Sequence, residues 1–381
     1  MSTTADLLRT PLHKMHVEAG AMMVDFAGWE MPLHYGSILE EHRQTRRSGG
    51  FFDVSHMGRL RFTGRDARRF LDRVCTRQIA GMERGMVRYS LVCNERGGCR
   101  DDVLVSCIDE HEYLMVCNAS NRLKLLEHFA AVKGDMVFKL DDETKSTVMV
   151  AIQGPRVMEL VANFSKEIPA LKRYRFAEKR VMLAKLLVSR TGYTGEDGIE
   201  IILGAAVASM AIKMLLGDSK DAASVVKPCG LGARDTLRTE AGMPLYGHEI
   251  SEELDPLSAG LAFAVKLDKG DDDPSVGRFI GQDALRALSA KGLERTLVGL
   301  KLEGRRSARP GMNVLQGDRV VGTVTSGCLS PTLEHPIAMA YAPPSCAAPG
   351  TPFVVDLGRE KVAAQVAPLP FYKAPPPRSL T

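Results

Sequence analysis

Alternating apolar and polar positions predict a run of strands in the first third of the chain. The segments VRYSLVC (87–93), DVLVSCI (102–108) and EYLMVC (112–117) are rich in β-branched and aromatic residues. The polar turns NERGG (94–98) and DEH (109–111) separate them. Short turns join antiparallel neighbours, so this region is predicted to form a three-stranded meander.

A second pattern, with apolar residues three or four positions apart, predicts amphipathic helices between the strands. The helical segments are 38–48, 65–75, 118–133, 154–164, 205–216, 233–241 and 282–290. Glycines follow several of them directly, as at 49–50 and 217, where a helix is expected to stop. Further strands are predicted at 51–64, 136–153, 181–192 and 198–203. Strands and helices mixed in this way predict an α+β protein.

The character of the chain changes near Thr296. Short β-like runs alternate with Gly and Pro from there on, and twelve of the 20 prolines lie at or after Pro310. So many turns predict a small antiparallel barrel or sandwich. We place the boundary before it near the acidic linker KGDDDP (269–274) or just after the helix at 282–290. Residues 376–381 are expected to form a flexible tail.

Size and charge narrow the class of protein. A chain of 381 residues suits two or three domains. Its 50 basic and 46 acidic residues nearly balance, which gives no case for nucleic acid as the main partner. The longest apolar runs, 181–188 and 205–216, are too short or contain Lys, so no membrane span is expected. The first residues lack the apolar segment of a secretory signal, and a cytoplasmic location is expected.

The eight cysteines give no sign of a metal centre. None forms a C-x-x-C pair, and no His lies at zinc-finger spacing from them. We expect them to be reduced and mostly buried, and we expect no metal site.

A first candidate for chemistry is the acidic pair Asp101-Asp102, which follows the turn at 94–98. Adjacent residues on a strand point to opposite faces, so one carboxylate is expected to face a cavity while the other meets solvent or a turn amide. The alternative is a plain hairpin whose acids cap the turn.

A second candidate is the segment SRTGYTGEDGIE (189–200), with a glycine at every third position. A strand rather than a helix follows these glycines, so the segment is not a dinucleotide-binding fingerprint. Glu200 opens that strand, where a buried carboxylate could hold an amidine-like group through two hydrogen bonds. The alternative is an exposed strand residue.

Two further segments carry charged or titratable side chains. In ARDTLRTEA (233–241), Arg234 and Arg238 share one helix face, either as a surface ladder of ion pairs or with Arg234 in an anion-binding pocket. In FDVSHMG (52–58), Ser55 and His56 are neighbours and cannot form a catalytic triad with each other. His56 is interpreted as a hydrogen-bonded structural histidine.

The order of these segments carries more information than any one of them. FDVSHMG, NERGGCRDD, YLMVCNA, GYTGEDGIE, GLGARDTLRTEAGMPLYGHE and GTVTSGCLSPTLEHPIAMAY occur in succession. Together they resemble the glycine cleavage T-protein family, from about Thr10 to Tyr372. The resemblance implies a three-domain cloverleaf around a central folate channel, with two α/β domains that have antiparallel sheets and a C-terminal distorted β-barrel.

The same resemblance implies domain bounds and a reaction. Residues 1–50 and 140–230 are expected to form the first domain, 51–139 and 231–290 the second, and 291–375 the barrel. The implied reaction moves the methylene of an aminomethyl group to tetrahydrofolate and releases ammonia. A lipoyl group on a partner, the H-protein of the glycine cleavage system, carries that aminomethyl group.

The resemblance also implies the residues of the site. Asp101 matches the catalytic position, where a carboxylate beside the folate N10 can accept its proton. The expected folate-binding residues are Tyr113, Asn118, Glu200, Arg234, Phe263 and Arg295. Phe263 stands where many relatives have Trp, and the sequence around Arg295 is less basic than in the family.

Two alternatives share this fold. A free-standing folate-dependent demethylase would need no lipoylated partner, whereas the type fused to a flavin dehydrogenase would need a flavin domain that this sequence lacks. A folate-binding assembly factor for iron–sulfur proteins would carry a Cys in a Lys-Gly-Cys-Tyr context. The corresponding stretch here reads EAGMPLYGHE and has no Cys.

Overall fold

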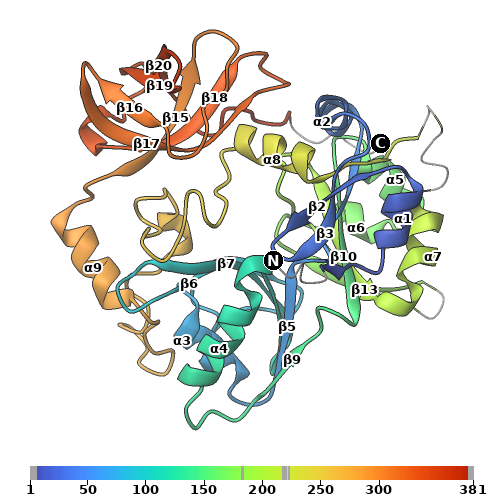
Figure 1. The fold of residues 1–381 in the computed structure, drawn as a ribbon. Coiled ribbons are helices and arrows are strands. Elements are labelled where there is room, and N and C mark those ends of the chain that lie inside the picture. Colours follow the sequence, from blue (N-terminus) through green and yellow to red (C-terminus); the bar gives the residue numbers. More distant parts are fainter. Residues whose placement is uncertain (1–6, 182–183, 217–220, 222–223, 376–381) are drawn as a thin grey trace, which may run out of the picture.

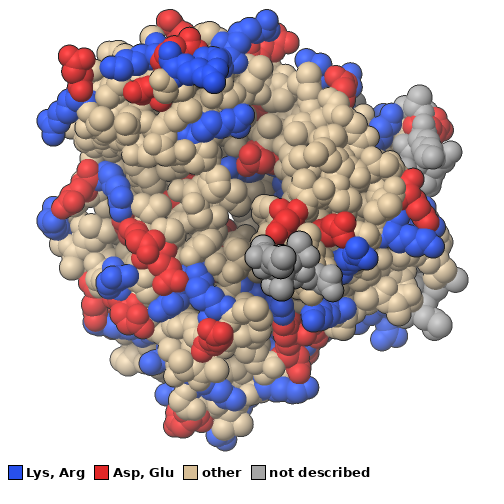
Figure 2. Space-filling model, in the orientation of Figure 1, with Lys and Arg blue, Asp and Glu red and all other residues tan. Residues whose placement is uncertain are grey.

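Three lobes surround a common centre (Figure 1). The computed structural model describes residues 7–181, 184–216, 221 and 224–375. The proposed tail, 376–381, and the helix stop at Gly217 lie outside these residues. Figure 2 shows acidic and basic side chains interspersed over one face, with the surface hollowed where the lobes meet. None of the described helices is long and apolar enough to cross a membrane.

The first lobe is built on a six-stranded sheet that combines distant parts of the chain. Its strand order is β11-β12-β13-β10-β4-β14. These strands are β4 (Gly50–Asp53), β10 (Thr147–Gln153), β11 (Phe176–Val181), β12 (Ala184–Ser189), β13 (Gly198–Gly204) and β14 (Lys227–Pro228). The lobe also contains helices α2 (Ile38–Arg47), α5 (Val157–Ala162), α6 (Glu167–Ala170) and α7 (Ala205–Leu216). Aliphatic side chains from the strands and from α5 and α7 form one buried core.

A small sheet from the N-terminal segment completes this lobe. It has the order β1-β3-β2, with β1 (Leu8–Arg9), β2 (Met22–Phe26), β3 (Trp29–His34) and the short helix α1 (His13–Glu18). The turn between β2 and β3 places Ala27 and Gly28 at positive φ, 53° and 79°. The sequence predicts no strands here, because a Gly-containing aromatic stretch lacks a regular period of two.

The second lobe holds the predicted meander. Its five-stranded sheet has the order β6-β7-β8-β5-β9. The strands are β5 (Gly58–Thr63), β6 (Val87–Cys93), β7 (Cys99–Asp109), β8 (Glu112–Cys117) and β9 (Lys139–Asp142). Helices α3 (Ala67–Val74) and α4 (Arg122–Val132) belong to the same lobe, and their side chains share its buried core with those of the sheet. Four phenylalanines form the aromatic centre of that core: Phe62, Phe70, Phe129 and Phe138.

A buried lysine ties a later segment to this lobe. Lys269 is 0% exposed and donates to the carbonyl oxygens of Asp72, Cys75 and Arg77 at 2.5, 2.9 and 2.9 Å. These carbonyls lie at and beyond the C-terminal end of α3, where an ammonium group is favourable. The linker that the sequence placed at 269–274 is therefore anchored at its first residue.

The third lobe is a closed six-stranded barrel. Its order is β15-β18-β17-β16-β19-β20, and β20 pairs with β15 to close it. The strands are β15 (Thr296–Leu302), β16 (Asn313–Gln316), β17 (Arg319–Leu329), β18 (Pro336–Ala342), β19 (Pro352–Asp356) and β20 (Lys361–Ala367). Helix α9 (Gln282–Lys291) precedes it. The sequence left open a barrel or a sandwich. Because β20 pairs with β15, the sheet closes into a barrel and has no free edge.

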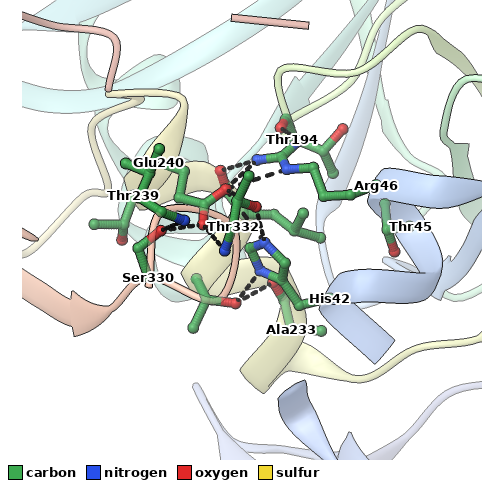
Figure 3. A network of polar contacts seen from close by, with 12 residues as sticks. His42, Thr45, Arg46, Thr194, Ala233, Thr239, Glu240, Ser330 and Thr332 are labelled. Carbon is green, nitrogen blue, oxygen red and sulfur yellow. Dashed lines mark hydrogen bonds and ion pairs between the residues drawn. The ribbon is translucent and has the colours of Figure 1, made fainter. Parts of the chain in front are cut away.

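One carboxylate joins the barrel to the first lobe (Figure 3). Glu240 is the last residue of α8 (Leu231–Glu240) and is 0% exposed. It accepts hydrogen bonds from Arg46 of α2 at 2.9 and 3.1 Å, and the ring of His42 on the same helix lies 3.2 Å away. From the barrel, the Thr332 amide and hydroxyl donate to it at 3.1 and 2.8 Å. We call Glu240, Arg46, His42 and Thr332 the lobe junction.

The charges of the junction set the protonation of Glu240. Burial alone raises the pKa of a carboxyl group. The hydrogen bond and charge of His42 and the charge of Arg46 outweigh burial here and lower the pKa of Glu240 to about 2. A carboxyl group whose pKa is lower in the folded state stabilises that state above its unfolded pKa, and this stabilisation is lost as the pH falls through the folded pKa.

We therefore expect Glu240→Gln to lower the free energy of unfolding at pH 7 by on the order of 3 kcal/mol. The deficit relative to the wild type should shrink as the pH falls from about 4.5 towards 2, because the wild-type carboxylate then becomes protonated as well. Urea unfolding at pH 7, 4 and 3 measures this difference. Glu159→Gln removes an ion pair with Arg156 that is about 40% exposed, and it serves as the control. A deficit that is the same at every pH would contradict the assigned charge of Glu240.

Candidate functional site

A buried carboxylate lies where the second lobe turns towards the centre of the molecule. Asp101, near the start of β7, is 0% exposed. Its Oδ2 accepts the backbone N–H of Asn118 at 2.9 Å. Its Oδ1 accepts side-chain N–H groups from Asn118 at 2.8 Å and Asn121 at 2.7 Å. Both asparagines follow directly on β8, the strand paired with β7, so the sheet itself brings these groups together.

The second acid of the pair belongs to the same network. The Nδ2 atom of Asn118 also lies 2.7 Å from Oδ1 of Asp102, so one amide group bonds both carboxylates. Asp102 is partly exposed, as expected for the second acid, and the side chain of Asn118, which follows the neighbouring strand β8, binds its carboxylate as well. Arg100, the residue before Asp101, pairs with Glu252 at 3.3 Å.

The surroundings of the two acids favour protonation. Burial and the charge of Asp102 raise the pKa of Asp101 far above its ordinary range, although the amides of Asn118 and Asn121 act in the opposite direction. Burial also raises the pKa of Asp102, against the hydrogen bonds from Asn118 and Tyr89. Within the described chain, neither acid forms an ion pair with Lys, Arg or His.

An aromatic surface adjoins this pair. The Tyr89 hydroxyl donates to Oδ2 of Asp102 at 3.2 Å. The ring of Phe263 stacks on the ring of Tyr89, with centroids 6.0 Å apart and planes at 22°. Phe263 is 67% exposed, which is unusual for a large apolar side chain. A flat apolar surface is thus available beside the acids.

The first lobe contributes a buried Glu and a buried Arg. Glu200 on β13 is 5% exposed and accepts the Thr191 hydroxyl at 2.5 Å, so it is not an exposed strand residue. Burial raises the pKa of Glu200, while the charge of Arg234 acts to lower it. Arg234 on α8 lies over the Tyr193 ring, 4.9 Å from its centroid. Its Nη1 is buried and has no hydrogen-bond partner among the described residues.

The ladder of ion pairs considered for α8 forms only at its other arginine. Arg238 pairs with Asp235 at 2.8 Å and with Glu249 at 3.0 Å. Arg234 has no such pair in the described part of the chain, which leaves its guanidinium available to a ligand. The pattern of charges along the helix could not separate these two roles, because both arginines lie on the same face.

The contacts of His56 differ from those predicted from the sequence. The side chain is buried and its ring contacts Phe26 edge to face, with centroids 5.4 Å apart. Its Nδ1 has no hydrogen-bond partner among the described residues, so a hydrogen-bonded structural histidine is not what the structure shows at that atom. Burial, with the charges of Arg234 and Arg59, lowers the pKa of His56 to about 4, against the charge of Asp53. The ring is neutral at pH 7.

Tyr193 joins the two halves of the site. Its side chain is partly buried, and the phenol donates to the carbonyl oxygen of Pro244 at 2.5 Å. Burial raises the pKa of this phenol, as does the charge of Asp102, whereas the charge of Arg234 lowers it. The acidic pair of the second lobe and the Glu200–Arg234 pair of the first therefore face the same region, around the glycine-rich loop 192–198.

Two expected site residues lie elsewhere. Tyr113 is 2% exposed in the core of the second lobe, where its hydroxyl donates to the carbonyl oxygen of Glu110 at 3.1 Å. Arg295 lies over the ring of Tyr341 and donates to the carbonyl oxygen of Glu253 at 3.1 Å. It lines a pocket of about 440 Å³ beside the barrel. The structure thus brings together Asp101, Asn118, Phe263, Glu200 and Arg234, but neither Tyr113 nor Arg295.

Three further residues of the site were not predicted from the sequence: Tyr89, Asn121 and Tyr193. Asn121 had a signal, since it follows Asn118 by three positions and a single turn places both side chains near one point. Among the described residues, no group of three or more His, Cys, Asp or Glu side chains could hold a metal ion.

Comparisons with known proteins agree with one another. Residues 12–269 match the model of the GCVT N-terminal domain, and residues 295–373 match that of the glycine cleavage T-protein C-terminal barrel domain. The aminomethyltransferase of Rubrobacter xylanophilus is 45% identical over 96% of this chain and 95% of its own length. That of Symbiobacterium thermophilum is 43% identical, over 97% and 98% of the two chains.

The fold agrees with that of a solved aminomethyltransferase structure. The crystal structure of the glycine cleavage system aminomethyltransferase T from Bartonella henselae superposes with a TM-score of 0.88. It is 33% identical, and the match covers 97% of this chain and 99% of that one. The α+β fold with largely antiparallel sheets and a terminal barrel is thereby confirmed. The chain belongs to the glycine cleavage T-protein family of aminomethyltransferases.

Proposed function

We propose that the protein transfers the methylene of an aminomethyl group from the lipoyl arm of an H-protein to tetrahydrofolate, and that ammonia is released. The products are 5,10-methylenetetrahydrofolate and the dihydrolipoyl H-protein. The observation that carries this proposal is the buried Asp101 carboxylate, which two asparagines hold beside a region that Glu200 and Arg234 also face. Membership of the family supports the choice of reaction.

The reaction needs a group that takes up and gives back protons. Two bonds of the aminomethyl carbon break, to sulfur and to nitrogen, and two form, to N5 and N10 of folate. Two protons leave the folate nitrogens, and one ends on the lipoyl sulfur and the other on the departing ammonia. Arylamine N10 is a weak nucleophile, so a carboxylate that accepts its proton during attack speeds the step. Asp101 has the raised pKa that suits this exchange at neutral pH.

The first lobe offers a matching recognition site for the pterin ring. Its 2-amino group and N3–H form a donor edge, and a carboxylate can accept from both at once. We assign this contact to Glu200, which is buried and, in the described part of the chain, has only the Thr191 hydroxyl as a side-chain hydrogen-bond partner. The unpartnered Nη1 of Arg234 can donate to an acceptor of the same ligand. Phe263 offers its exposed face for stacking on the folate.

The lipoylated H-protein is the proposed partner, and the cytoplasm the proposed location. The acceptor folate and the carrier arm must meet at Asp101, so the arm has to reach the region where the lobes meet. That surface is hollowed, and it carries both signs of charge (Figure 2).

Asp101→Asn should reduce the rate of methylene transfer by about a hundredfold or more, because the amide cannot accept a proton. The assay mixes purified protein with tetrahydrofolate and aminomethyl-loaded H-protein, and it follows ammonia and methylenetetrahydrofolate together. Asp109→Asn, at the exposed end of the same strand, is the control and should keep the wild-type rate. Wild-type protein that binds folate but releases no ammonia from the loaded carrier would refute the proposed function.

Glu200→Gln should weaken tetrahydrofolate binding by roughly ten- to a hundredfold, since a neutral amide can no longer accept two charge-assisted hydrogen bonds. Asp101→Asn should bind folate nearly as well as the wild type. Calorimetric titration with tetrahydrofolate measures both. Glu178→Gln, on the same sheet but paired with Lys185 at the surface, is the matched control. Equal affinity for the wild type and Glu200→Gln would exclude Glu200 from the pterin contact.

A further inference from the structure

The acidic pair shares a single hydrogen-bond donor group. The Nδ2 atom of Asn118 carries two hydrogens, and it lies 2.8 Å from an oxygen of Asp101 and 2.7 Å from an oxygen of Asp102. The two carboxyl groups are therefore held close together by one amide. Asn121 and the backbone of Asn118 complete the partners of Asp101, while the Tyr89 hydroxyl is bonded to Asp102.

Neither acid forms an ion pair with a Lys, Arg or His among the described residues. The cations close in sequence are paired with other acids: Arg100 with Glu252 at 3.3 Å, Lys124 with Glu252 at 3.1 Å, and Arg122 with Asp142. The other titratable groups close enough to feel the charge of the two acids are phenols and thiols, which are neutral at pH 7. They are Tyr89, Tyr193, Tyr246, Cys99 and Cys117.

Two carboxyl groups so close together, one buried and one partly buried, cannot both ionise readily when no cation is paired with them. Ionising one leaves a negative charge beside the other and raises the free energy of the second ionisation. The amides of Asn118 and Asn121 stabilise a single negative charge. The stable state near neutral pH therefore holds one proton on two carboxyl groups.

We propose that Asp101 and Asp102 hold one proton between them, and that Asp102 is a positioning residue whose charge tunes the proton affinity of Asp101. This inference rests on the proposed function for its purpose. The pair accepts a proton from a folate nitrogen as the new bond to carbon forms, and it returns one to the departing amine. No proton is gained or lost by the pair over a turnover.

The test compares Asp102→Asn with the wild type by ¹³C NMR of protein labelled at the aspartate carboxyl carbons. Asp101→Asn assigns the Asp101 signal by its disappearance. The wild-type Asp101 signal should titrate well above the ordinary pKa of about 3.9. In Asp102→Asn it should titrate at least about one unit lower, because the neighbouring negative charge is gone. Asp109→Asn should leave it unchanged.

The pH dependence of single-turnover methylene transfer gives a second readout. Asp101 accepts a proton as its carboxylate, so the rate falls when the pH drops through its pKa. The midpoint of this acidic limb should move to lower pH in Asp102→Asn and stay in place in Asp109→Asn. A merely structural role of Asp102 would lower the rate at every pH without moving the midpoint.

The NMR titration needs no activity, so failure of the proposed function and failure of the shared proton are distinguishable. An Asp101 signal that titrates at the same pH in the wild type and in a folded Asp102→Asn variant overturns the shared proton. A shifted signal in a protein that makes no methylenetetrahydrofolate keeps the shared proton and refutes the reaction.

Discussion

The arrangement of the lobes depends on the buried carboxylate of Glu240. It lies at the end of α8 and bonds side chains of α2 on one side and the barrel loop on the other. Arg234 is on the same helix, six residues earlier and about 9 Å along its axis. The contacts that attach the barrel therefore also fix where the Arg234 guanidinium lies. A movement of α8 that disturbed the contacts of Glu240 with the barrel would therefore also move Arg234.

Two buried carboxylates lie in different surroundings, and they have different roles: Glu240 is structural, whereas Asp101 is proposed to exchange protons. Glu240 is surrounded by Arg46, His42 and hydroxyl groups, which hold the pKa of its carboxyl group low and keep it charged at neutral pH. Asp101 lies beside a second acid, and burial together with that acid raises its pKa against the opposing effect of the amides of Asn118 and Asn121. The same functional group thus forms a stable ion pair at Glu240 and a proton-exchanging group at Asp101. The difference comes from the neighbours, because burial acts in the same direction on both.

Local patterns predicted local structure well, and long-range pairing poorly. The meander at 87–117, helix α8 and the C-terminal strands followed from periods of two and 3.6 residues. Periodicity could not reveal that β4 pairs with β10, since nothing in either segment identifies its partner. Strand β16, only four residues long, gave too short a signal.

The same limit applies to the site. Resemblance placed Asp101, but the role of Asp102 depends on one amide from the next strand, which alternation along β7 does not encode. Tyr113 was expected at the folate because it lies on the right strand. Its side chain instead packs in the core of the lobe, at the opposite end of that strand from Asn118. Burial of Glu200 likewise depends on neighbours that are distant in sequence. The sequence alone therefore could not decide whether Glu200 is buried or exposed.

The position of β4 has a consequence for how the chain acquires its fold. This strand, at residues 50–53, lies between β10, at 147–153, and β14, at 227–228. During synthesis its two neighbours emerge from the ribosome about 100 and 175 residues later, which at typical elongation rates is a delay of many seconds. The apolar strand GFFD stays unpaired for that time, while the second lobe, whose strands and helices lie between β4 and β10 in the sequence, can already form. Such non-local pairing slows folding and exposes a sheet edge to aggregation. The first lobe, although it begins the chain, is therefore completed after the second.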